Sequence, residues 1–160
     1  MIICEKVLGN LKEPEFQGCH ADKVEIEWHE AYKKLHSKVT AEGTEIGIRL
    51  DDSILTRGLR DGDVLYRSGN RVIAVSVPPC EVIVIRIAPD HPKMACKVCY
   101  EIGNRHGALL WGDDELSFIT PYNEPAFLLL QKLHGVSVTR KTRKLDFDRA
   151  ISSTVSDHHH

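Results

Sequence analysis

Imidazole side chains are the groups in this sequence with the clearest capacity for chemistry. The 160 residues include nine histidines; His158, His159 and His160 end the chain, and His106 directly follows an apolar segment expected to be helical. Neutral imidazole binds Ni²⁺, Cu²⁺ and Zn²⁺, and the unpaired carbonyls at a helix C-terminus favour a nearby cation. His106 and His158–His160 are therefore candidate metal ligands. On the residues alone, a structural role for His106, such as capping the helix, is the favoured interpretation.

The terminal histidines allow two interpretations. Adjacent imidazoles in a flexible segment bind metal whatever their origin, so they are candidate ligands. The remnant of a purification tag would have the same sequence. Metal affinity alone therefore does not separate a native tail from a tag.

Thiols are the second group of interest. The five cysteines are Cys4, Cys19, Cys80, Cys96 and Cys99. An odd count without a secretory signal argues against a disulfide framework and for the reducing cytoplasm. Cys96 and Cys99 form a lone CxxC in the middle of an expected helix, which is not a usual zinc frame. We interpret the pair as packing residues, with a metal or redox role as the alternative, and Cys19-His20 as a further possible metal contact.

Composition excludes several classes of protein. Hydrophobic residues make up 42% and charged residues 28% of the chain, with a formal net charge of −2. This balance is typical of a globular protein and gives no basic face for nucleic acid or a membrane surface. No apolar run reaches the ~20 residues that cross a bilayer. The sequence has no Ser/His/Asp set and no glycine-rich phosphate loop, so we expect no enzyme, and any nucleotide-driven step belongs to a partner.

The first half of the chain has the pattern of short β-strands. Apolar and polar residues alternate in four segments separated by Gly, Asp and Asn turns: 23–28, 45–50, 64–66 and 71–77. Such spacing predicts a small β-sandwich or barrel. The segment 28–38 is expected to be a short helix or an irregular crossing.

After Pro78-Pro79, strands and helices alternate. The expected order is strand 81–87, helix 90–103, strands 109–111 and 115–120, helix 124–134 and strand 136–143. This order is the split βαβ arrangement of ferredoxin-like domains. Residues 146–160 carry little apolar surface and are expected to form a flexible tail. The predicted fold is therefore α+β: a β-rich domain at 1–77, a ferredoxin-like domain at 78–145 and a histidine-ending tail.

The segment Glu101-Ile-Gly-Asn-Arg-His106 resembles the signature of UreE-type urease accessory proteins, which are nickel metallochaperones. Gly43–Leu50 and Leu59–Leu65 are similar to the same family, and the resemblance covers residues 1 to about 145. It implies a partner-binding N-terminal domain and a metal-binding, dimerising C-terminal domain. Some family members carry additional histidines in the strand after the signature, whereas Phe118–Asn123 has none.

The resemblance also implies a function. Two copies of His106 in a homodimer would share one Ni²⁺, with Zn²⁺ and Cu²⁺ as competitors, and the protein would pass nickel to a urease accessory GTPase and apo-urease in the cytoplasm. One alternative is a nickel-independent protein-interaction scaffold. A second alternative, an RNA-binding platform, lacks aromatic residues on 81–87 and a basic surface.

Overall fold

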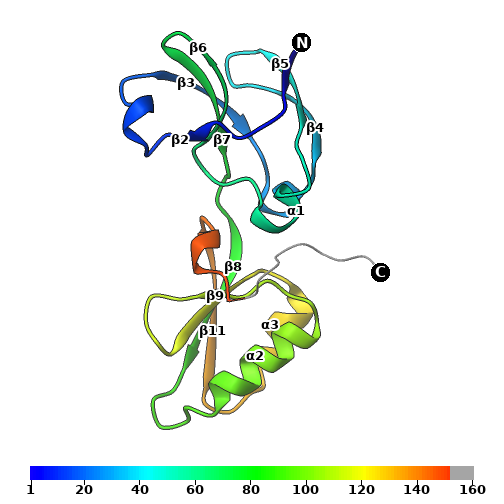
Figure 1. The fold of residues 1–160 in the computed structure, drawn as a ribbon. Coiled ribbons are helices and arrows are strands. Elements are labelled where there is room, and N and C mark those ends of the chain that lie inside the picture. Colours follow the sequence, from blue (N-terminus) through cyan, green and yellow to red (C-terminus); the bar gives the residue numbers. More distant parts are fainter. Residues whose placement is uncertain (152–160) are drawn as a thin grey trace. The chain divides into compact units, whose positions relative to one another are not determined.

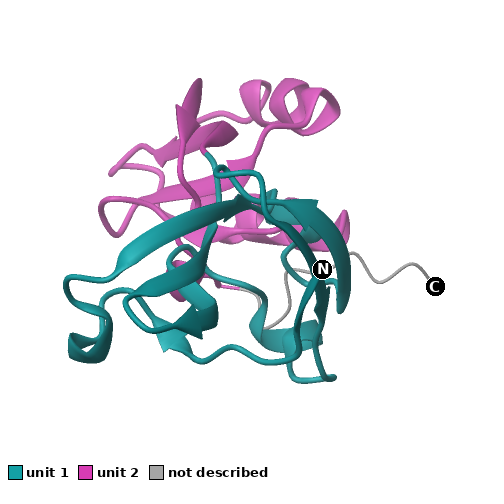
Figure 2. Cartoon of the chain, turned by 90° about the horizontal axis from the view of Figure 1, so that it is seen from above, with its two compact units in different colours: residues 1–78 teal, residues 79–160 magenta. Residues whose placement is uncertain are grey.

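The computed structural model describes residues 1–151. The chain divides into two compact units, Met1–Pro78 and Pro79–His160 (Figure 2). The division falls one residue after the boundary expected at 77. No helix among residues 1–151 is long and apolar enough to cross a membrane.

Unit 1 is built from two open sheets (Figure 1). A three-stranded sheet has the order β1-β5-β4, and a four-stranded sheet has the order β2-β6-β7-β3. The strands are β1 Ile2–Cys4, β2 Gly9–Asn10, β3 His20–Glu25, β4 Leu35–Val39, β5 Glu45–Arg49, β6 Asp63–Ser68 and β7 Arg71–Ser76. The short helices are η1 Pro14–Phe16, η2 Trp28–Glu30 and α1 Ile54–Arg57.

The alternating pattern predicted the inner strands of unit 1 but not all of its edges. In β5, Ile46 and Ile48 are buried while Glu45 and Arg49 are exposed, as the alternation indicates. The segment 28–38 contains η2 and then β4, a strand that was not predicted. In the edge strand β4, the apolar residues Leu35 and Val39 are exposed. The strand therefore lacks the alternation of buried apolar and exposed polar residues that identifies a half-buried strand.

Unit 2 has the predicted βαββαβ order. Its elements are β8 Cys80–Ile87, α2 Met94–Asn104, β9 Leu110–Trp111, β10 Ser117–Pro121, α3 Glu124–Gln131 and β11 Val136–Arg143. The sheet order is β11-β8-β10-β9, with every neighbouring pair antiparallel. Each helix thus connects two strands that have one other strand between them, which confirms the α+β, ferredoxin-like prediction.

One face of this sheet packs against both helices. Ile83, Ile85 and Ile87 of β8 form a core with Val98 and Ile102 of α2 and with Ala126 and Leu130 of α3. Val82 and Val84 are also buried. Burial on both faces explains why β8 is a continuous β-branched run rather than an alternating one.

Described structure continues beyond the expected start of the tail at 146. Leu145 and Phe147 are buried, and η3 spans Phe147–Arg149. Ala150 bridges to Leu110, and the Ile151 N–H donates to the Leu109 carbonyl over 2.8 Å. The apolar pair Leu145 and Phe147 therefore extends unit 2 by several residues. The predicted ligands His158, His159 and His160 lie outside the described residues.

Candidate metal site

His106 occupies the turn that ends α2. The helix ends at Asn104 with Arg105 as its C-cap, and two backbone hydrogen bonds close the turn. The His106 N–H donates to the Gly103 carbonyl and the Gly107 N–H donates to the Ile102 carbonyl, each over 3.0 Å. This bond pattern is a Schellman motif, which places His106 at the position that adopts a left-handed backbone.

The backbone of His106 is indeed left-handed, with φ of 57°. It is the only non-glycine residue with positive φ among residues 1–151. Glycine is the usual residue at such a position, and a side chain there costs roughly 1–2 kcal/mol. His106 is exposed, so burial of its side chain is not what offsets this cost. The motif satisfies the carbonyls of Ile102 and Gly103 through the backbone, so the imidazole is not needed as a cap.

The His106 imidazole is free to bind a ligand within the described part of the chain. No hydrogen bond, ion pair or ring contact engages it among residues 1–151. Nor does this part of the chain contain any group of three or more His, Cys, Asp or Glu side chains placed to hold one metal ion. A single exposed imidazole fits Ni²⁺ as one donor. The remaining donors must come from elsewhere: a second copy, residues beyond 151, or water.

The CxxC pair lies closer to the start of α2 than predicted. The helix begins at Met94 rather than near Asp90, which places Cys96 in the first turn and not in the middle. Cys96 is exposed and Cys99 is half-buried, and burial raises the pKa of the Cys99 thiol, with a smaller contribution from Cys96. Cys99 contacts the core formed by β8 and the two helices, which agrees with a packing role for this residue.

The remaining candidate, Cys19-His20, lies in unit 1. His20 begins β3, and its Nε2 atom is hydrogen-bonded to the carboxylate of Glu42, which also pairs with Arg71. The imidazole therefore already has a partner and belongs to a surface ion-pair network. The geometry gives no support to a metal contact there.

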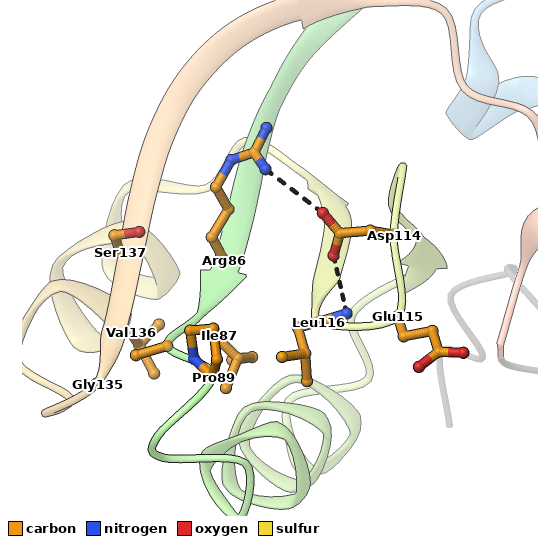
Figure 3. A pocket seen from close by; sticks show the side chains of 10 residues that line it. Arg86, Ile87, Pro89, Asp114, Glu115, Leu116, Gly135, Val136 and Ser137 are labelled. Atoms are coloured by element: carbon orange, nitrogen blue, oxygen red, sulfur yellow. Dashed lines mark hydrogen bonds and ion pairs between the residues drawn. The ribbon is translucent and has the colours of Figure 1, made fainter.

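An open cavity of about 780 Å³ lies at one end of the unit 2 sheet (Figure 3). Arg86 and Asp114 point toward each other across it and form an ion pair of 3.7 Å. Pro89, Gly135 and Ser137 belong to its wall. None of the lining residues is a histidine or cysteine, so the cavity itself does not resemble a nickel site.

One pair of histidines was not predicted from the sequence. His91 and His134 face each other with ring centroids 4.6 Å apart. They lie 43 positions apart in the chain, and neither belongs to a recognisable motif. Only the folding of unit 2 brings the loop before α2 next to the turn after α3.

Comparison with known proteins places these features in a family. Residues 4–78 match the model of the UreE urease accessory protein N-terminal domain. The urease accessory protein UreE of Acetivibrio thermocellus is 40% identical over 144 residues, which cover 90% of this chain and 89% of that protein. Those of Helicobacter pylori strain HPAG1 and Helicobacter acinonychis are 40% and 39% identical over 145 residues, covering 91% of this chain and 83% of each relative. The chain belongs to the UreE family of urease accessory proteins.

Proposed function

We propose that this protein takes part in urease maturation by binding Ni²⁺ through His106 and delivering it to apo-urease. The ion is cargo in this role, so the site must collect the metal and also release it. One observation carries the proposal: the exposed His106 imidazole, which has no partner among residues 1–151, stands where glycine would be less strained. Side chains kept in such conformations cluster at functional sites.

A homodimer completes the site in this proposal. A single imidazole binds nickel too weakly to carry it, and a two-fold axis next to the end of α2 brings two copies of His106 together. The tail residues His158–His160 add further imidazoles. Because this ligand set is made of imidazole, Zn²⁺ and Cu²⁺ compete with Ni²⁺.

The N-terminal unit serves as the partner-binding part. On one face of its β1-β5-β4 sheet, four apolar side chains are exposed: Met1 at 77%, Ile3 at 52%, Leu35 at 67% and Val39 at 60%. Gly47 lies between them, and the atoms nearest to a Cβ at this position would be Ile3 Cδ1 and Met1 Sδ. Exposed apolar side chains on a sheet face favour protein association, and here they alternate with Ser37, Glu45 and Arg49 on the same face. We assign this face to the urease assembly, including the accessory GTPase, in the cytoplasm.

Calorimetric titration of Ni²⁺ into the full chain tests the proposal. His106→Ala is expected to weaken the interface site by at least about 100-fold, because both copies of the ligand are lost together and even an outer-shell change costs 10–100-fold. His29→Ala is the matched control, since His29 is another exposed histidine. Sedimentation measures the dimer in the same samples.

The alternative scaffold function makes the opposite prediction. If the chain is a nickel-independent scaffold, substitution of His158–His160 abolishes Ni²⁺ binding and His106→Ala changes nothing. That result would overturn the proposed role of His106 while leaving the family assignment intact.

A further inference from the structure

The pair formed by His91 and His134 is separate from the His106 site. His91 precedes the first residue of α2 by three positions, and His106 follows its last residue by two. The 11 residues of α2 span roughly 16 Å at 1.5 Å per residue, so the two sites lie at opposite ends of the helix. A metal ion at one end is not bound by residues of the other.

The two imidazoles have the separation that a shared metal ion requires. Their centroids are 4.6 Å apart and their planes are at 81°. Metal–nitrogen bonds measure about 2.0–2.1 Å, and a ring centroid lies roughly 1.1 Å beyond the nitrogen, so two cis ligands have centroids about 4.5–5 Å apart. The observed separation of the two ring centroids falls in this range.

A carboxylate lies beside one ring of the pair. Nδ1 of His91 is shielded from solvent and lies 3.0 Å from Oδ1 of Asp90. Within the described residues this nitrogen makes no aligned hydrogen bond. In metal sites, a carboxylate beside one imidazole nitrogen fixes the tautomer that leaves the other nitrogen available to the metal. Asp90 is placed to do this for Nε2 of His91.

The backbone is shaped to bring the two rings together. Gly135 follows His134 in a left-handed turn with φ of 77°, and a Cβ added there would lie 2.7 Å from Cβ of His91. The Ala88 N–H donates to the Gly135 carbonyl over 2.8 Å, which fastens the loop before α2 to this turn. The pair is thus held by main-chain contacts on both sides, while the exposed His134 keeps the site open to solvent.

We propose that His91 and His134, with Asp90 orienting His91, form a second metal-binding site for a divalent ion that prefers imidazole, such as Ni²⁺, Zn²⁺ or Cu²⁺. With two protein donors and water completing the coordination, the site binds such an ion weakly and exchanges it readily. It also joins the β8–α2 loop to the α3–β11 turn when occupied.

Titration of Zn²⁺ followed by nuclear magnetic resonance of the histidine ring nitrogens tests this site. The protein is the full chain with His158, His159 and His160 replaced by alanine, which removes tail ligands and keeps the length. The Nε2 signal of His91 and one ring-nitrogen signal of His134 are expected to shift together along one binding curve. Absence of a response at millimolar Zn²⁺, or two responses with different midpoints, would overturn the proposal.

Single substitutions decide whether the ion is shared. His134→Asn is expected to abolish the response of His91, and His134 is exposed, so the fold should tolerate the change. Asp90→Asn keeps both rings and is expected to weaken binding by about 10–100-fold. A His91 response that persists unchanged in His134→Asn contradicts a shared site.

Two controls separate this site from the proposed nickel function. His106→Ala is expected to leave the His91 and His134 signals and their midpoint unchanged, whereas it removes the interface site. His29→Asn, at an exposed histidine whose ring lies against Trp28, is expected to leave them unchanged as well. These controls can therefore refute the second site without refuting the His106 site. They can equally refute the His106 site without refuting the second site.

Discussion

Two left-handed positions follow the two helices of unit 2, and the chain fills them differently. Gly135 comes after α3 with φ of 77°, and His106 comes after α2 with φ of 57°. At 135, glycine relieves backbone strain and leaves the space that His91 occupies. At 106, the chain carries an exposed imidazole although glycine would be less strained. Stability explains the first choice and not the second, so position 106 is where a binding role is the better explanation.

The same comparison separates two kinds of histidine site. His91 and His134 are paired within one chain by packing, whereas His106 meets no partner among residues 1–151. A site of the first kind is complete when the chain folds. A site of the second kind depends on a second copy or on residues beyond those described. Dependence on outside ligands suits the proposed role in nickel delivery.

Gly135→Ala is the substitution expected to have the largest effect on stability. Alanine in a left-handed turn costs roughly 1–2 kcal/mol, and the close approach to His91 adds an overpacking cost of about 1–3 kcal/mol. We expect the free energy of unfolding to fall by about 2–5 kcal/mol, measured by urea denaturation. Gly69→Ala, at φ of 60° with nothing within 4 Å of an added Cβ, is the control for backbone strain alone. Equal losses of unfolding free energy in the two variants would show that the close approach to His91 contributes nothing.

Acidification is expected to weaken nickel binding at the His106 site. The metal needs neutral imidazole, and the unperturbed pKa of imidazole is about 6.5. Lowering the pH from about 7 to about 5.5 is therefore expected to weaken binding steeply, because both copies of the ligand are affected. The sign follows because protons compete with the metal, and affinity falls as pH falls. Calorimetry at several pH values checks this, and a flat profile would indicate carboxylate ligands.

Replacing His158–His160 by alanine is expected to weaken nickel binding by one to two orders of magnitude, or about 1.4–2.7 kcal/mol. Tethered imidazoles reach millimolar effective concentration near a site on the same chain. A double-mutant cycle with His106→Ala gives the mechanism: non-additive losses mean that both sets of ligands share one ion. Strictly additive losses mean a separate tail site or a tag.

The smallest effect is expected at His106 itself when metal is absent. His106→Gly is expected to raise the free energy of unfolding by about 0.5–1 kcal/mol, because glycine relieves the left-handed strain but makes the unfolded chain more flexible. His106→Ala keeps the strain and should be nearly neutral. Thermal unfolding of the metal-free variants measures both. A His106→Gly variant less stable than the parent would show that the imidazole has a structural role after all.

Local patterns predicted most of the architecture because each depends on neighbours in the sequence. The β-branched run Glu81–Ile87 became the central strand β8, and Val136–Arg143 became β11 over the same residues. Errors occurred where local signals are weak or ambiguous. The start of α2 was expected near Asp90, but its N-cap is Lys93 and no side chain caps it. Asp90 lies instead 3.0 Å from His91, a contact that no short-range pattern indicates.

The sequence by itself determined the family and the α+β class and indicated His106 as a candidate ligand, because signature residues and periodicity are contiguous along the chain. Tertiary structure alone decided what surrounds each imidazole. The Schellman turn set the strained backbone of His106 and left its ring unpartnered among the described residues. The sheet and its two helices brought His91 to His134 across 43 positions. Two side chains so far apart in the sequence meet only because distant segments pack together. No periodic pattern of residues indicates such a contact.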